Sequence, residues 1–241
     1  MQIQWLVFAV FCLALVADHL VFWRGFERRV EVDAGKARRI LWTQWIVMLW
    51  GCSALVMALW IAQGLPLAAL GLEMPTGLRL WVPLVLTAAF VALQISTGFK
   101  IARLPDRTKL HQRVGSTGLI MPRDASELPV IALASLSAGF CEELLCRGFV
   151  IWLFQPFVGW WIAAILSLAL FTLAHIYQGK EGMIKVAALG GLLTLVVALC
   201  HSLWPAIVLH AAIDLTGGWI GWQIFREREA MPPALEPLSP R

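Results

Sequence analysis

The chain has 241 residues and a formal net charge of +4 at neutral pH. Hydrophobic residues make up 60% of the chain and charged residues only 14%. This leaves too little polar surface to cover a soluble core of this length, so an ordinary soluble domain is excluded. The modest positive charge is explained by attraction to anionic lipid and requires no nucleic acid as a partner.

Apolar residues cluster into runs that approach or exceed the roughly 20 residues needed to cross a bilayer. Seven such runs occur, at 3–23, 40–62, 80–99, 129–155, 157–177, 184–200 and 203–222. Because the run at 184–200 is short and the stretch 64–72 could be re-entrant, six to eight spans fit the sequence. The expected fold is an all-α, polytopic transmembrane helical bundle of about seven spans.

Lys and Arg residues collect in alternate connections between these runs. The linkers 24–39 and 100–123 each hold six basic residues, and basic pairs follow the fifth and seventh runs. Since basic loops remain cytoplasmic, the N-terminus is expected outside and the C-terminus in the cytoplasm. The short loops suit the inner (plasma) membrane of a bacterium, with the lipid bilayer as a partner. The first run lacks a positive n-region and is interpreted as a retained anchor.

The chain divides into three parts on this basis. Residues 1–127 form a three-span membrane region with a cytoplasmic linker, 128–222 form a four-span region, and 223–241 form a disordered cytoplasmic tail. In the first part, Asp18 and His19 lie near the end of a run, where snorkelling to the interface makes a polar side chain inexpensive. No chemistry is therefore expected from the N-terminal half.

The C-terminal half holds ionisable groups inside its apolar runs. These groups are Glu142, Glu143, Arg147, His175, His210 and Asp214. One charged residue at the centre of a membrane helix costs about 2.5–3.5 kcal/mol on insertion scales. Several such groups are therefore expected to satisfy one another, and intramembrane ionisable residues indicate a functional site.

The spacing of the acidic residues separates two roles. Glu143 and Arg147 are four residues apart, in the favoured acid-before-base order, and this predicts an ion pair on one helical face. Glu142 is rotated from Glu143 by about 100° and has no partner on its own helix. It is therefore the carboxylate free to act as a general base.

Two further pairs share a helical face. Phe171 lies four residues before His175, and His210 lies four residues before Asp214, whose carboxylate can orient the imidazole. The three motifs, in chain order, are Glu142-Glu143-x-x-x-Arg147, Phe171-x-x-x-His175 and His210-x-x-x-Asp214.

These three motifs resemble those of the CAAX protease and bacteriocin-processing family, also called the Abi family, to which the type II CAAX prenyl endopeptidases belong. The resemblance covers residues 128–222 and implies an intramembrane protease core there. The family's third motif commonly ends in Asn, whereas this chain has Asp214.

The resemblance implies hydrolysis of a peptide bond in a membrane-associated protein or peptide. By analogy, Glu142 would activate water with help from His175. His210 and Asp214 would polarise the scissile carbonyl and stabilise the oxyanion. Phe171 would support the site, as would the Glu143 ion pair. Lipidated substrates and C-terminal segments are among those that the family processes.

No cofactor is favoured, although zinc remains an alternative because Glu and His can bind it. The ligands would then be Glu142, His175 and His210. The chain has no His-Glu-x-x-His helix, and these ligands would have to come from three separate helices. A metal-free glutamate mechanism is therefore preferred.

Two other functions fit the same residues. A proton-coupled transporter could relay protons through buried Glu and His, and a non-catalytic membrane scaffold or immunity protein could retain the site. Substitution of Glu142 separates these hypotheses: a protease loses cleavage, a transporter loses flux, and a scaffold loses nothing.

Overall fold

The structure, a computed structural model, describes residues 2–226, apart from the side chain of Ser116. The described residues form helices and connecting turns without a strand, which confirms the all-α prediction. The α-helices are α1 (Gln2–Ala17), α2 (Arg24–Val30), α3 (Ala34–Ala62), α4 (Leu78–Arg103), α5 (Thr108–Val114), α6 (Leu128–Glu142), α7 (Ile151–Val158), α8 (Trp160–Ala174), α9 (Gly179–Cys200) and α10 (Trp204–Phe225). The π-helical segments are η1 (Asp18–Trp23) and η5 (Glu143–Val150). The short 3-10 helices are η2 (Leu67–Leu70), η3 (Gly115–Ile120), η4 (Ala125–Glu127) and η6 (Ile176–Gln178).

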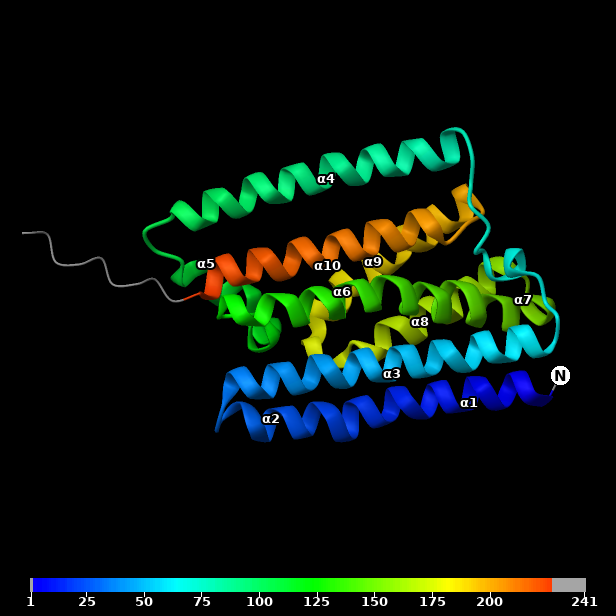
Figure 1. Cartoon of the computed structure of the whole chain (residues 1–241), viewed down its shortest axis with the longest axis horizontal. Coiled ribbons are helices and arrows are strands. Elements are labelled where there is room, and N and C mark those ends of the chain that lie inside the picture. Colours follow the sequence, from blue (N-terminus) through cyan, green and yellow to red (C-terminus); the bar gives the residue numbers. More distant parts are fainter. Residues whose placement is uncertain (1, 227–241) are drawn as a thin grey trace, which may run out of the picture.

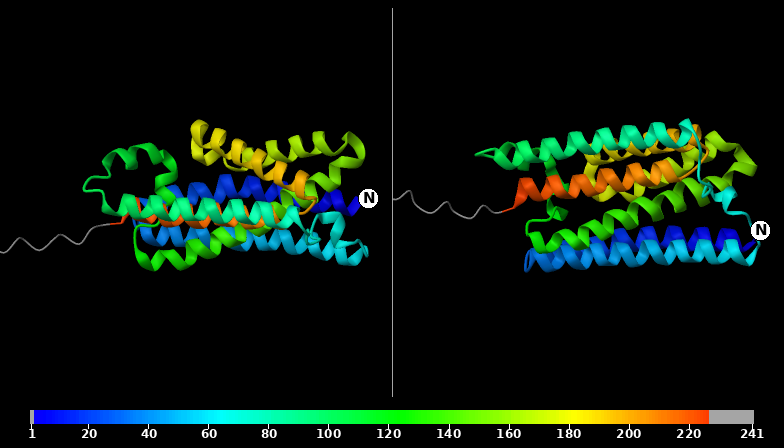
Figure 2. Two further views of the ribbon diagram at one scale, coloured as in Figure 1. Left: turned by 90° about the horizontal axis from the view of Figure 1, so that it is seen from above. Right: turned by 45° about the horizontal axis from the view of Figure 1, so that its top comes forward.

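The long helices form one bundle. Helices α1, α3, α6, α10 and α4 run side by side along the long axis of the molecule (Figure 1). The right-hand view of Figure 2 again shows α4 at the edge of the bundle, next to α10. Helix α10 packs against α6, α4 and α9, and α6 also packs against α3. Helix α10, which carries the third motif, and α6, which leads into the first motif at Glu142, are therefore interior elements.

Five helical segments are long and apolar enough to cross a membrane. They are Gln2–Val30, Ala34–Ala62, Leu78–Arg103, Ala125–Val158 and Ile176–Cys200. The predicted runs 157–177 and 203–222 correspond to α8, which is apolar but shorter, and to α10. Each predicted run thus coincides with one helical segment, as expected for an integral membrane protein.

Local sequence explains where several helices begin. The Asp33 side chain caps α3 by accepting a hydrogen bond of 2.9 Å from the Lys36 amide. Pro129 and Pro205 stand in the first turns of α6 and α10, where a missing N–H removes no helical hydrogen bond. Gly159 has φ of 77°, and this left-handed residue allows the tight turn between α7 and α8.

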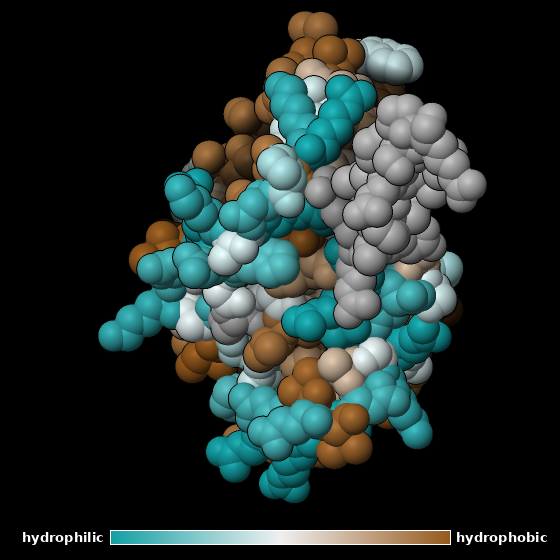
Figure 3. All heavy atoms as spheres, turned by 90° about the vertical axis from the view of Figure 1, so that its left-hand side faces the viewer, coloured by the Kyte–Doolittle hydropathy of each residue, from teal (hydrophilic) through white to brown (hydrophobic). Residues whose placement is uncertain are grey.

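The polar connections lie at one end of the bundle. The α2–α3 turn, α5 and the end of α10 are found there (Figure 1). Figure 3 views this end and shows hydrophilic side chains gathered over it. The stretch 64–72 lies at the opposite end and contains the short helix η2. Of the predicted tail 223–241, residues up to Phe225 still belong to α10, and 227–241 lie outside the described residues.

A buried ion pair joins the two halves of the chain. Arg38 of α3 lies 2.9 Å from Glu127, which directly precedes α6, and their side chains are 4% and 0% exposed. Glu127 also accepts hydrogen bonds of 2.7 and 3.2 Å from the backbone amides of Arg123 and Asp124. The start of α6 is therefore fixed against α3.

Candidate functional site

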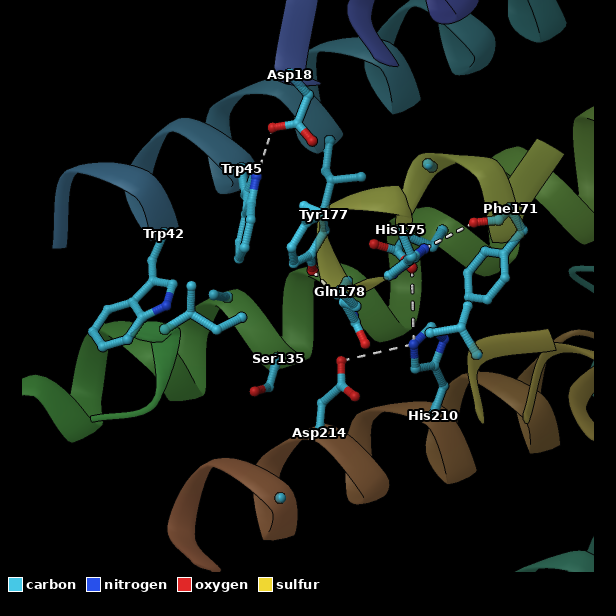
Figure 4. A pocket seen from close by; sticks show the side chains of 18 of the residues that line it. Asp18, Trp42, Trp45, Ser135, Phe171, His175, Tyr177, Gln178, His210 and Asp214 are labelled. Carbon is cyan, nitrogen blue, oxygen red and sulfur yellow. Dashed lines mark hydrogen bonds and ion pairs between the residues drawn. The ribbon is translucent and has the colours of Figure 1, made fainter. Parts of the chain in front are cut away.

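A cavity of about 380 Å³ opens among the helices, and the four predicted catalytic residues line it together with Phe171. Glu142 comes from the end of α6. His175 directly follows α8, and His210 and Asp214 come from α10 (Figure 4). Helix α8 has only 15 residues, and the α8–α9 turn stops short of the polar end of the bundle (Figure 1). His175 therefore lies inside the bundle, close to the other three side chains.

Glu143 is the central side chain behind the cavity. The Glu143 side chain is 0% exposed, and its Oε1 accepts from Arg147 Nη1 at 3.0 Å. This is the ion pair that the spacing predicts. The guanidinium of Arg147 also donates to the Gly190 carbonyl at 3.1 Å and lies 4.2 Å from the centre of the Phe171 ring. The buried charges are thus paired with each other, with a carbonyl and with a π-face.

Glu143 has a second partner that the spacing does not predict. His210 Nδ1 lies 2.8 Å from the same Oε1. Because that oxygen already accepts from Arg147, the imidazole donates, and His210 carries a proton on Nδ1. The sequence assigns orientation of this imidazole to Asp214, whose Oδ2 is 3.7 Å from His210 Nε2. The shorter contact identifies Glu143 as the residue that fixes the ring.

The contact between Glu143 and His210 requires a close approach of α6 and α10. Gly139 lies one turn before Glu143, and a Cβ atom there would be only 2.8 Å from the backbone nitrogen of Ala211. The absence of a side chain therefore lets the two helices meet next to the site. The close packing depends on two elements distant in sequence, so spacing within one helix does not reveal it.

His210 Nε2 faces the cavity between two carboxylates. Glu142 Oε2 is 3.9 Å away and Asp214 Oδ2 is 3.7 Å away. These side chains are 20% and 35% exposed, whereas that of His210 is 4% exposed. Both carboxylates can therefore reach a molecule in the cavity, while the imidazole is held in its wall.

His175 has a tautomer that its contacts define. It directly follows the last residue of α8, and its Nδ1 lies 2.8 Å from the Phe171 carbonyl. A carbonyl only accepts, so Nδ1 carries the proton, and Nε2 of the neutral ring has a free lone pair. The Phe171 ring lies 4.7 Å from the imidazole, centre to centre. The two residues predicted to share a helical face are therefore in contact.

Asp18 lines the cavity, contrary to the prediction that it snorkels to the interface. It is 7% exposed, whereas its neighbour His19 is exposed. The Trp45 indole donates to Asp18 Oδ1 at 2.7 Å, and the Trp45 ring lies 5.6 Å from that of Tyr177. A carboxylate inside a run of apolar residues was the available signal, but its nearness to the basic linker favoured an interfacial position.

A metal site is not preformed among these side chains. Within residues 2–226, no three His, Cys, Asp or Glu residues are grouped so that they could hold a metal ion. Both His175 and His210 use Nδ1 as a donor to a protein oxygen, which leaves Nε2 as the nitrogen available to any ligand.

Comparison with known families agrees with the geometry. Residues 124–216 match the family described as type II CAAX prenyl endopeptidase Rce1-like. The matched segment begins at the turn before α6, ends within α10, and contains all three motifs. No curated protein and no solved structure matches the chain significantly. The family match supports protease activity in a membrane-embedded protein. Residues 124–216 of the chain are therefore similar to the Rce1-like family of type II CAAX prenyl endopeptidases.

Proposed function

We propose that the protein is an intramembrane endopeptidase that hydrolyses a peptide bond of a membrane-associated protein or peptide. The observation that carries the proposal is the convergence of Glu142, His175 and His210 on one cavity inside a bundle of apolar helices. Each of these side chains has an atom that is not committed to a short hydrogen bond within the protein, so the three can act on the same bound peptide.

Glu142 is the general base in this proposal. Its neighbour Glu143 is sealed between Arg147 and His210, whereas Glu142 keeps 20% of its side chain exposed and lines the cavity. Glu142 would take a proton from a water molecule as the water attacks the scissile carbonyl, and it would later return the proton to the leaving amine. A well-placed general base typically accelerates a reaction by about 10²–10⁴-fold.

His175 assists at the same water. Its Nδ1–H is directed to the Phe171 carbonyl, so the lone pair on Nε2 can accept a hydrogen bond from the water that Glu142 activates. The fixed position at the end of α8 means that little reorganisation is needed when the substrate binds.

His210 provides the donor for the oxyanion. With Nδ1–H held by Glu143, a proton on Nε2 would make the ring a cation, and the nearby carboxylates of Glu142 and Asp214 favour that charge. The Nε2–H group would stabilise the negative charge on the tetrahedral intermediate, a contribution of roughly 3–4 kcal/mol for one donor in other proteases. Ionised Asp214 cannot donate as an Asn would, so it would act through His210.

No metal is required in this scheme. Should zinc bind, Glu142 and the Nε2 atoms of His175 and His210 would hold it, and the ion would polarise the carbonyl and the water. We favour the metal-free scheme because these three side chains are not grouped as a metal site within the described chain. The cleavage activity should therefore survive prolonged treatment with a chelator. If the activity were lost on chelation and recovered when zinc was added, the metal-free scheme would be contradicted.

The substrate enters from the polar end of the bundle in this proposal. The basic linkers gather at that end, so the positive-inside rule places it in the cytoplasm, with the N-terminus outside. A bacterial inner membrane is the proposed location. A lipidated tail or C-terminal segment of a membrane-associated protein would present its backbone at this depth.

A comparison in cells tests the function even while the substrate is unidentified. Membranes from cells that express the wild type or Glu142→Gln at matched levels would be compared for protein C-termini and released peptides. Cleavage products found only with the wild type would establish proteolysis and identify the substrate. If the wild type and the variant gave identical sets of C-termini and peptides under several growth conditions, the proposed protease function would be contradicted. Ion transport and a scaffold role would then be tested instead.

A further inference from the structure

The cavity has a second wall, which the N-terminal helices provide. Asp18 comes from η1, and Trp42 and Trp45 come from α3, outside the part of the chain that matches the family. Asp18 and Trp45 lie across the cavity from His210 and Asp214 (Figure 4). The N-terminal half therefore contributes polar groups to the space in which a substrate would lie.

Only one oxygen of Asp18 is used inside the protein. Oδ1 accepts from Trp45, whereas Oδ2 has no hydrogen-bond partner among the described residues. Oδ2 is also not sealed among side chains, so it faces the open cavity. A single neutral oxygen would be enough to hold the indole. A full carboxylate at this position is therefore more than the packing of Trp45 requires.

The Asp18 carboxylate also has no ion pair with a described side chain. Lys185 lines the same cavity, but it is exposed at the start of α9. Buried charges are normally paired, so the carboxylate is complementary to a positive group supplied from outside.

Trp42 lies in the same wall. It is 1% exposed, and its indole Nε1 is buried without a hydrogen-bond partner among the described residues. Buried donors are rarely left unpaired. Trp42 Nε1 is itself sealed from the cavity, so the group that this wall offers to a peptide is the accepting oxygen of Asp18.

We propose that Asp18 is a specificity-determining residue whose Oδ2 binds the positively charged side chain of a Lys or Arg in the cleaved peptide. This inference rests on the proposed endopeptidase function. The rings of Trp45 and Tyr177 lie beside the carboxylate and would contact the same cation through their faces. A peptide with an acidic side chain at that position would be rejected by like charge.

The variant Asp18→Asn distinguishes a role of Asp18 in binding the substrate from a role in holding Trp45 in place. The amide oxygen can still accept from Trp45, while the cavity-facing oxygen becomes an NH₂ donor. Glu27→Gln is the matched control, because the Glu27 side chain accepts from the Trp23 indole at 2.8 Å and does not line the cavity. Asp18→Glu restores the charge if the amide variant fails to fold.

The experiment identifies cleavage sites from new C-termini and released peptides in cells that express the wild type or one of these variants at matched levels. Sites cut by the wild type should carry Lys or Arg at one fixed position relative to the broken bond. Asp18→Asn should lower the yield of these products by about tenfold or more, the loss expected when one partner of a desolvated charge pair is removed. Glu27→Gln should leave the yield unchanged, and Asp18→Glu should recover much of it.

The possible failures are distinguishable. Wild-type cleavage sites without a fixed basic residue, or equal yields from Asp18→Asn and Glu27→Gln, would overturn the role of Asp18 while leaving the protease function intact. If Asp18→Asn does not accumulate in membranes, equal cutting of basic and neutral sites by Asp18→Glu would overturn it as well. A complete lack of products that depend on the wild type would overturn both proposals.

Discussion

Two adjacent glutamates differ in this site because of what surrounds each carboxylate. Glu143 is fully buried, and one of its oxygens contacts both Arg147 and His210. Glu142 faces the cavity, and its closest charged neighbour is His210 at 3.9 Å. Glu143 therefore holds the side chains of the site in place, and Glu142 is available to a substrate.

Substitution of these glutamates should affect stability very differently. Glu143→Ala leaves the Arg147 guanidinium buried without its carboxylate, and breaking a buried ion pair typically costs about 3–5 kcal/mol. Glu142→Ala removes a partly exposed side chain and should change the free energy of unfolding far less. Thermal unfolding of both purified variants in the same detergent measures the contrast. Equal midpoints for the two variants would contradict the assignment of Glu143 as the buried support.

The motif residues could be predicted individually because ionisable groups are rare at membrane depth. The contacts that the sequence did not predict all join different helices. The Glu143–His210 bond depends on how α6 packs against α10, and Asp18 reaches the cavity only because η1 and α3 bring it there beside Trp45. Spacing within one helix carries no information about either contact.

At the scale of the helices, the close packing of α6 against α10 brings the acidic and histidine motifs together. Gly139 is the contact point, because a Cβ atom there would also lie 2.8 Å from Ala211 Cβ. The neighbouring backbone cannot move aside as the end of a flexible side chain could.

Gly139→Ala should therefore lower stability by about 1–3 kcal/mol, the usual cost of overpacking, and should reduce cleavage by separating Glu143 from His210. Gly191→Ala is the control, since nothing lies within 4 Å of a Cβ atom at that position on α9. The control should be neutral or more stable by roughly 0.5–1 kcal/mol, because Ala favours a helix over Gly. Thermal unfolding and product formation report both effects, and an equally stable Gly139→Ala variant would contradict the close-packing argument.

Hydropathy predicted the helices well but not their internal irregularities. The predicted run 129–155 is one helical segment, yet it contains the π-helical stretch η5, which no residue type marks in advance. The run 157–177 was expected to form one span, but the helix within it, α8, ends at Ala174. That early end places His175 inside the bundle, where it lines the cavity.

At the scale of the whole molecule, the N-terminal and C-terminal halves form one structure. The Arg38–Glu127 pair is buried between them, with two N–H···O contacts of 3.1 Å in addition to the ion pair. The adjacent Arg39 reaches the same turn, but its contact with Ser126 is exposed. Arg38 and Arg39 thus allow a buried ion pair and an exposed hydrogen bond between the same two segments to be compared.

Arg38→Met should destabilise the protein by about 3–5 kcal/mol, because Glu127 would be left as an unpaired buried charge. Arg39→Met should cost no more than about 1 kcal/mol, as exposed polar links contribute little. Denaturant titration of the purified variants distinguishes the two. If both variants lost a similar free energy of unfolding, the two halves of the chain would not be joined through the Arg38–Glu127 pair.

The orientation of the bundle can be tested with single cysteines. Lys109 of α5 and Glu73 are exposed at opposite ends of the molecule. In a variant in which the five native cysteines (Cys12, Cys52, Cys141, Cys146 and Cys200) are replaced, Glu73→Cys should react in intact cells with a thiol reagent that cannot cross the membrane. Lys109→Cys should react only after lysis. The reverse pattern would contradict a cytoplasmic polar end.

The most direct test of the proposed mechanism is cleavage by purified protein in lipid vesicles. The substrate would be the peptide identified in cells, and the rate of appearance of its new C-terminus would be measured for the wild type and Glu142→Gln. We predict a loss of about 10²–10⁴-fold in the variant, the contribution typical of a general base, with an unchanged unfolding temperature. Equal rates for the two proteins would contradict the central claim that Glu142 activates the attacking water.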